Sequence, residues 1–186
     1  VIGKIFYKTD VRNAGSGNLG GTNAGRLLGK RVGISVIMLD AIKVIVAVGF
    51  IAIYIDPIVS IWAGVAAAFG HCYPVFANFR GGKAVATMFG FLFSIAIFTF
   101  QDPLVFLLPF ACFVVSLLLS KMVSLSSIIA AIASSIYIIT LTNYTSVQVA
   151  SILLTFLLIH RHRDNIKRII AGNEHKVGFL KKKKRS

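Results

Sequence analysis

The chain alternates between long apolar runs and short polar or charged stretches. The apolar runs cover residues 33–55, 58–76, 84–101, 103–119, 122–142 and 145–160. Each run is bounded by charge or proline, and its length is close to or above the roughly 17 residues that a helix needs to cross a bilayer. The opening residues, VIGKIFY, look like the last turns of a further helix. The pattern predicts an all-α polytopic membrane protein with six full transmembrane helices and an N-terminal helix stub, in one integral membrane domain over residues 1–186.

The distribution of charge predicts how the bundle is oriented in the membrane. The chain has 20 Lys and Arg against 6 Asp and Glu, and 56% of its residues are hydrophobic. Every Lys and Arg except Lys43 falls before the first span, after the last span, or in alternate connections between them. The positive-inside rule places this face and the C-terminus in the cytoplasm, with residues 179–186 as a basic cytoplasmic tail near anionic headgroups. Nucleic acid is not expected as a partner, because long apolar spans separate the basic residues.

Lys43 lies within the first full span, three residues after Asp40 and on the same helical face. Because an isolated charge in a membrane is costly, a structural ion pair is the favoured interpretation. A proton or substrate path through the membrane is the alternative.

Three polar segments, residues 12–31, 70–87 and 160–178, all fall on the basic face. Their glycines let backbone amides approach an anion, and their hydroxyl and amide side chains can donate to phosphate oxygens. Their Arg and Lys residues supply positive charge. The Gly81-Gly82-Lys83 stretch leads into a span, so its amides are expected at the positive end of a helix. These segments predict a pocket for phosphorylated ligands at the boundary between membrane and cytoplasm.

The stretch GSGNLGGTN at residues 15–23 has the glycine spacing of a dinucleotide-binding turn and also resembles the end of a P-loop. A dinucleotide-binding turn needs a preceding strand, whereas a helix stub precedes this one. A P-loop needs lysine where Gly21 stands. Both nucleotide interpretations therefore fail on context.

The histidines are candidate metal ligands. His160, His162 and His175 lie near the C-terminus without a nearby cysteine, which makes a weak metal set. His71 is expected to be a satisfied histidine at a helix end. We therefore expect no metal.

Taken in order, the three segments resemble the bacterial membrane glycerol-3-phosphate acyltransferases that use acyl phosphate as donor. The family motifs GSGNxGxTNxxR, GHxxPxFxxFxGGKxVAT and HRxNIxRxxxGxE match residues 15–26, 70–87 and 162–174, and the SLSSI run at 124–128 is also similar. Position 84 is Ala where many members have Gly. The family begins about one helix earlier, so the resemblance implies seven spans in complete members and an N-terminally truncated chain here.

The resemblance implies a reaction. A fatty acyl group would pass from acyl phosphate to the 1-hydroxyl of sn-glycerol 3-phosphate, giving lysophosphatidic acid and phosphate in the first acylation step of phospholipid synthesis. Acyl-CoA and acyl carrier protein would not be direct donors, and neither a cofactor nor an obligate protein partner is implied. The enzyme would sit among the lipids of the bacterial plasma membrane, with its site facing the cytoplasm.

The residues expected to be most sensitive in catalysis are Ser16, Arg26, Lys83, His162 and Asn165. Those expected to bind substrate are Gly15, Gly17, Asn18, Thr22, Asn23, Gly81, Gly82, Arg161, Arg163 and Glu174. Arg26 and Lys83 would neutralise phosphate, while Ser16 and Asn165 would orient phosphate or glycerol. His162 could accept the proton of the attacking hydroxyl; alternatively the substrate phosphate accepts it and His162 only binds.

Two other classes of function share some of these features. A transporter of an anionic organophosphate would also need basic, glycine-rich loops, but its site is expected near the midplane between inverted repeats. A lipid-binding scaffold would explain the basic tail but not three dense motifs. Within the enzyme hypothesis, direct attack on acyl phosphate is favoured over a covalent acyl-enzyme on Ser16.

Overall fold

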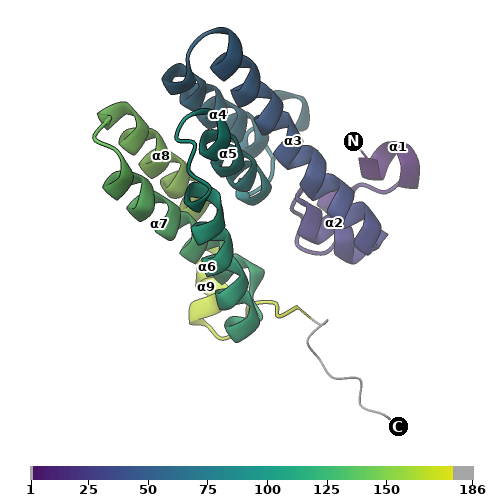
Figure 1. Cartoon of the computed structure of the whole chain (residues 1–186). Helices are drawn as coiled ribbons and strands as arrows, with labels where there is room; N and C mark the ends of the chain where they lie inside the picture. Colours follow the sequence, from purple (N-terminus) through teal and green to yellow (C-terminus); the bar gives the residue numbers. More distant parts are fainter. Residues whose placement is uncertain (1, 178–186) are drawn as a thin grey trace.

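The computed structural model describes residues 2–177, and every regular element within them is helical (Figure 1). Two short 3₁₀ turns are η1 (Val11–Asn13) and η2 (Val75–Ala77). The α-helices are α1 (Ile2–Tyr7), α2 (Gly21–Leu28), α3 (Lys30–Tyr54), α4 (Pro57–Cys72), α5 (Val85–Phe98), α6 (Leu104–Ser120), α7 (Val123–Leu141), α8 (Thr145–Arg161) and α9 (Arg163–Ile170).

The six long apolar helices, α3 to α8, coincide with the six predicted spans, so the all-helical prediction is confirmed. Within the described residues, three segments are both long and apolar enough to cross a membrane: Lys30–Tyr54, Pro57–Ala77 and Val123–Leu141. The other three helices are apolar but shorter. The predicted basic tail at 179–186 lies outside the described residues.

Residues in the turns between spans fix where the helices begin and end. Asp56 caps α4, because one of its carboxylate oxygens accepts the backbone N–H groups of Ile58 and Val59 at 2.8 Å each. Pro57 occupies the first turn of α4, where its missing N–H costs nothing. Lys121 adopts a left-handed conformation (φ 61°) that ends α6 and turns the chain into α7.

The core lies where α3, α4, α5, α7 and α8 pack together. Its largest fully buried side chains include Phe91, Ile61 and Leu158. Small residues bring the helices close: a Cβ on Gly64 would overlap the ring of Phe91, and one on Gly90 would lie 3.0 Å from the Cα of Ala41. Close approach through small residues is the usual way in which helices associate in lipid.

Two features add to the expected layout of the N-terminal half. The first polar segment is not only a loop, because α2 forms within it and packs against the start of α3. The ammonium group of Lys43 contacts His71 at the end of α4. Lys43 therefore lies level with the last turn of α4, within the apolar helix Lys30–Tyr54.

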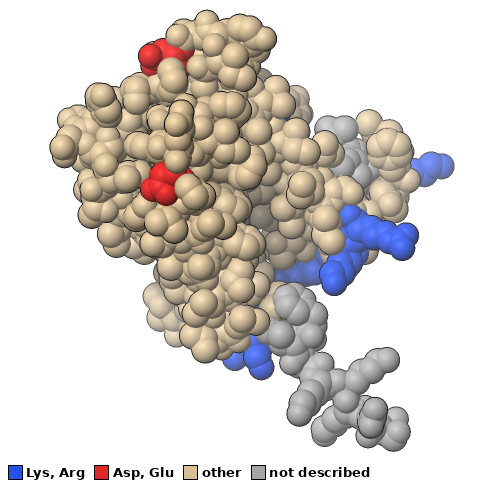
Figure 2. Space-filling view, viewed as in Figure 1, with Lys and Arg blue, Asp and Glu red and all other residues tan. Residues whose placement is uncertain are grey.

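The charges are separated along the molecule. In the face shown by Figure 2, Lys and Arg gather at the end that carries α1, α2 and α9, as comparison with Figure 1 shows. The visible acidic side chains lie away from that end. The polar segments and most of the positive charge therefore share one end of the bundle.

Candidate active site

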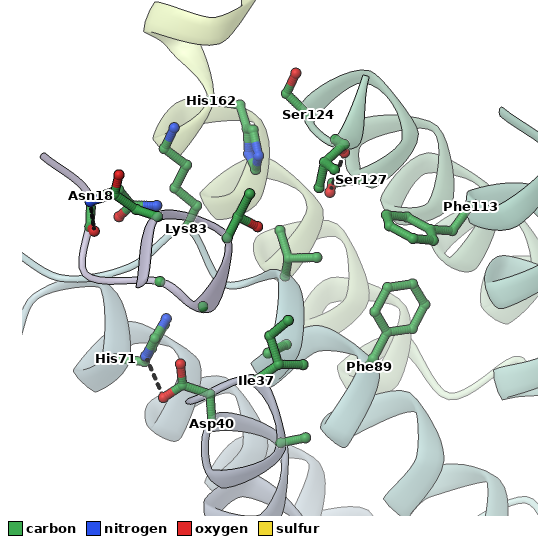
Figure 3. Close-up of a pocket in the computed structure, with 18 of the residues that line it drawn as sticks. Asn18, Ile37, Asp40, His71, Lys83, Phe89, Phe113, Ser124, Ser127 and His162 are labelled. Carbon is green, nitrogen blue, oxygen red and sulfur yellow. Dashed lines mark hydrogen bonds and ion pairs between the residues drawn. The ribbon is translucent and has the colours of Figure 1, made fainter. Parts of the chain in front are cut away.

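A cavity of about 520 Å³ opens where α2, α3, α5, α6, α7 and α9 approach one another. Its polar end is formed by side chains of all three polar segments: Ser16, Asn18, Thr22, Asn23, Arg26, Lys83, His162, Asn165, Arg168, Glu174 and His175. Its apolar arm is formed mainly by α3, α5 and α6 (Figure 3). The cavity therefore offers cations and hydrogen-bonding groups beside a hydrocarbon-like surface.

The buried side chain of Asn23 forms hydrogen bonds to the backbone of the first polar segment. Its side chain is 1% exposed, and its Nδ2 donates to the carbonyl oxygens of Val11, Ala14 and Asn18 at 2.9, 3.2 and 3.0 Å. Its Oδ1 accepts the backbone N–H of Ser16 at 2.9 Å. The side chain that was expected to donate to phosphate thus also ties the loop to α2.

Glycine is required at position 15 for two reasons. Its backbone has φ 62°, which favours glycine, and a Cβ there would overlap the amide of Asn23. Gly17 also has a positive φ of 68°. Gly15 and Gly17 shape the turn and do not line the cavity, whereas Ser16 and Asn18 do.

The Gly81–Gly82 turn is fully bonded within the protein. The N–H of Gly81 donates to Cys72 and that of Gly82 to His71, both at 3.1 Å. Their carbonyl oxygens accept Nη2 and Nε of Arg161 at 3.1 and 3.0 Å. The two amides are not free to hold an anion as expected from the sequence, and the turn instead delivers Lys83 to the cavity.

Lys83 starts a polar network that crosses the cavity. Its Nζ donates to Oδ1 of Asn165, and Nδ2 of Asn165 donates to Glu174 at 2.6 Å. Ser124 and Arg168 donate to the same carboxylate at 2.7 and 2.8 Å. The network fixes the amide of Asn165 with its oxygen toward Lys83.

The network also sets the protonation of its members. Burial lowers the pKa of Lys83, and the nearby guanidinium of Arg168 lowers it further. Burial alone would raise the pKa of Glu174, but hydrogen bonds from Asn165, Ser124 and Arg168 outweigh it, so the net pKa is lowered. Glu174 is therefore an anion that holds side chains in place.

His162 occupies the junction between α8 and α9 and is 3% exposed. Its Nδ1 lies 2.8 Å from the carbonyl oxygen of Leu158. Since a carbonyl can only accept, Nδ1 carries the proton and Nε2 is left as an acceptor. Burial lowers the pKa of His162 to about 4. A neutral imidazole with an unprotonated Nε2 has the form that a general base requires.

Phenylalanines form much of the apolar arm, a feature that the sequence analysis missed. Phe89, on α5, makes edge-to-face contacts with Phe106, Phe110 and Phe113 of α6, with ring centroids 5.5 to 6.2 Å apart. Phe93 meets Phe106 in the same way. Their spacing of three and four residues was the available signal, but it is equally typical of a helix packed in a core.

All five residues expected to be most sensitive line the cavity, together with Asn18, Thr22, Asn23 and Glu174. The side chains of two predicted binding residues are bonded elsewhere: Arg161 holds the glycine turn, and Arg163 lies 3.1 Å from His160 at the surface. No cluster of three metal-ligating side chains occurs among residues 2–177.

Six further polar side chains line the cavity without having been predicted as ligands: Asp40, His71, Ser124, Ser127, Arg168 and His175. Arg168 and Ser127 lie within segments that matched the family, which was the available signal. Asp40 was interpreted as half of an ion pair with Lys43, and that pair is present at 2.7 Å. No sequence pattern indicated that it would also border the cavity.

Comparison with known proteins identifies one family. The family model described as glycerol-3-phosphate acyltransferase matches residues 1–172. A glycerol-3-phosphate acyltransferase of Macrococcus caseolyticus is 42% identical, over 97% of this chain and 90% of the relative. One from Geobacillus kaustophilus is 44% identical, over 95% and 87%.

Two crystal structures of PlsY, an integral membrane glycerol 3-phosphate acyltransferase, have the same fold at 38% identity. The glycerol 3-phosphate form has a TM-score of 0.85 over 96% of this chain and 89% of that chain. The lysophosphatidic acid form has a TM-score of 0.79 over 89% and 82%. This chain therefore belongs to the glycerol-3-phosphate acyltransferase family of integral membrane enzymes.

Proposed function

We propose that the chain transfers a fatty acyl group from acyl phosphate to the 1-hydroxyl of sn-glycerol 3-phosphate, with its site open to the cytoplasm. The relatives named above are glycerol-3-phosphate acyltransferases, and one similar structure is a lysophosphatidic acid form. The observation that carries the proposal is the cavity itself, whose cationic end adjoins an arm lined by phenylalanines. Such a cavity suits a reaction in which both substrates carry phosphate and one carries an acyl chain.

In the proposed reaction the hydroxyl oxygen of glycerol 3-phosphate forms an ester bond with the acyl carbon. The bond between that carbon and the phosphate oxygen breaks, and phosphate leaves with the electron pair. Nε2 of His162 accepts the hydroxyl proton; the competing route gives that proton to a substrate phosphate oxygen. Because acyl phosphate is already activated, positioning and charge stabilisation supply much of the catalysis.

The chain's cations would hold the two phosphate groups. Lys83 reaches the cavity from the loop just before α5, and Arg26 reaches it from α2. Ser16 and Asn165 would orient phosphate or glycerol through hydrogen bonds. The acyl chain would lie against the phenylalanine arm, which places the reacting carbon between the arm and the cations.

The direct test supplies acyl phosphate and glycerol 3-phosphate to the purified protein and measures phosphate release together with lysophosphatidic acid. We expect Lys83→Met and His162→Gln each to lower turnover by about 100-fold or more, since each removes a group that acts on charge or a proton. His160→Gln is the matched control, because His160 is exposed and does not border the cavity.

The outcomes separate the parts of the proposal. Absence of turnover by the folded wild-type protein would contradict the reaction. Equal turnover with acyl-CoA would contradict the choice of donor. An acyl adduct on Ser16 after incubation with acyl phosphate alone would replace direct attack by a covalent route.

A further inference from the structure

A polar cluster of Asp40, Lys43 and His71 joins α3 to the end of α4. Asp40 and His71 line the cavity and lie side by side in Figure 3. Nζ of Lys43 donates to Oδ1 of Asp40 at 2.7 Å and lies 2.8 Å from Nδ1 of His71. Nδ1 of His71 lies 3.4 Å from the same Asp40 oxygen. Ionisable groups within apolar helices are costly and mark functional positions, yet the reaction proposed above gives this cluster no part.

The ring of His71 occupies the space beside Gly82. The three atoms nearest to a Cβ built on Gly82 all belong to that ring. The backbone carbonyl of His71 also accepts the N–H of Gly82 at 3.1 Å. Gly82 thus packs against His71 on one side, while Arg161 donates hydrogen bonds to the carbonyl oxygens of Gly81 and Gly82.

The cluster on α3 holds that ring in one orientation. Nζ of Lys43 lies 2.8 Å from Nδ1 of His71, and Oδ1 of Asp40 lies 3.4 Å from the same nitrogen, so both residues contact one edge of the ring. Asp40 holds the ammonium group in turn. Contacts therefore run without interruption from Asp40 and Lys43 through His71 to Gly82, whose next residue is Lys83.

We propose that Asp40, Lys43 and His71 are positioning residues that set the Gly81–Gly82 turn and thereby aim Lys83 at the reacting phosphate groups. The inference rests on the proposed function, which gives Lys83 its role. A displacement of about 1 Å in a reacting group costs up to about 100-fold in rate. Loss of the cluster is therefore expected to reduce catalysis although its members act only through the turn.

The first test is a double-mutant cycle. The wild type, Asp40→Asn, His71→Ala and the double variant are each assayed with acyl phosphate and glycerol 3-phosphate. We expect Asp40→Asn to lower kcat/KM by about tenfold. The double variant should equal His71→Ala within about twofold, because Asp40 acts through the ring. Because Lys83 is proposed to hold a substrate phosphate group, we expect KM to rise both in Lys83→Met and in Asp40→Asn, whereas a merely destabilised protein would lose kcat alone.

Asp102→Asn is the matched control, because Asp102 accepts the hydroxyl of Tyr137 at 2.6 Å and does not border the cavity. It should leave kcat/KM unchanged. Losses from Asp40→Asn and His71→Ala that multiply would show that Asp40 acts independently of the ring, and would overturn the inference.

The second test uses the steric contact between Gly82 and the ring of His71. Gly82→Ala should lose activity, and adding His71→Ala should restore at least about tenfold, because the three atoms nearest to the new methyl group all belong to the ring. In Gly81→Ala the new Cβ lies 2.6 Å from backbone atoms of Cys72, so His71→Ala should restore nothing there. Equal restoration in both pairs, or none in either, would overturn the inference. Absence of wild-type turnover would instead contradict the proposed function.

Discussion

At the scale of single residues, burial determines the protonation state of His162. Its ring is 3% exposed and bonded through Nδ1 to the carbonyl of Leu158. Burial disfavours the charged imidazolium and lowers its pKa to about 4. His162 is consequently neutral from about pH 5 upward, so its Nε2 is unprotonated throughout the physiological range.

This protonation state can be measured directly. We predict that the ring of His162 titrates near pH 4, so that the base form is lost only as the pH falls through about 4. NMR of the protein labelled with ¹³C in its histidine rings follows the titration, and the signal absent from His162→Gln assigns it. A midpoint near the ordinary histidine value of about 6.5 would contradict the predicted burial.

The sequence was sufficient to predict many of the residues that line the cavity, but not which groups their side chains bind. Ser16, Lys83 and Asn165 were chosen by type and motif, and all line the cavity. Asn23 and Arg161 were chosen by the same reasoning, yet their side chains bond mainly to backbone carbonyls of the protein itself. An amide or a guanidinium binds a carbonyl as readily as a phosphate, so residue type alone cannot distinguish the two.

At the scale of elements, the apolar spans were predictable, but α2 was not. Its sequence, GTNAGRLL, has two glycines and little intrinsic tendency to form a helix. The helix instead depends on contact with α3, where the Cα of Gly25 approaches Gly33. Such a contact joins residues across a turn and leaves no periodic pattern in the sequence.

This contact predicts opposite outcomes for two glycine substitutions. In Gly33→Ala the new Cβ would lie 2.6 Å from the Cα of Gly25, so α2 must move and carry Thr22 and Arg26 with it. We expect a loss of at least about tenfold in turnover. In Gly70→Ala the methyl group meets nothing within 4 Å, and stability should stay equal or rise by about 0.5 to 1 kcal/mol.

Phosphate release and thermal unfolding of both variants check this prediction. Similar losses of activity in Gly33→Ala and Gly70→Ala would show that the contact between α2 and α3 does not position the site.

At the scale of the whole molecule, the cavity depends on how six helices are arranged. Hydropathy gives the number and order of the spans, because burial in lipid requires long apolar helices. It does not give which faces meet, so the phenylalanine arm between α5 and α6 went unnoticed. Its place in the sequence puts Lys43 within the apolar helix Lys30–Tyr54, and the structure agrees, but no pattern indicated that it would contact His71 at the end of α4.

The positive-inside rule then predicts the orientation of the entire bundle: the basic end faces the cytoplasm. Cysteine labelling tests this in a background in which the free cysteines, Cys72 and Cys112, are replaced by Ala. Asn143 is exposed in the turn between α7 and α8, and Asn173 is exposed after α9. A membrane-impermeant maleimide should label Asn143→Cys in intact spheroplasts and Asn173→Cys only after permeabilisation. The reverse pattern would place the cavity on the outer face, where a phosphorylated substrate made inside the cell could not reach it.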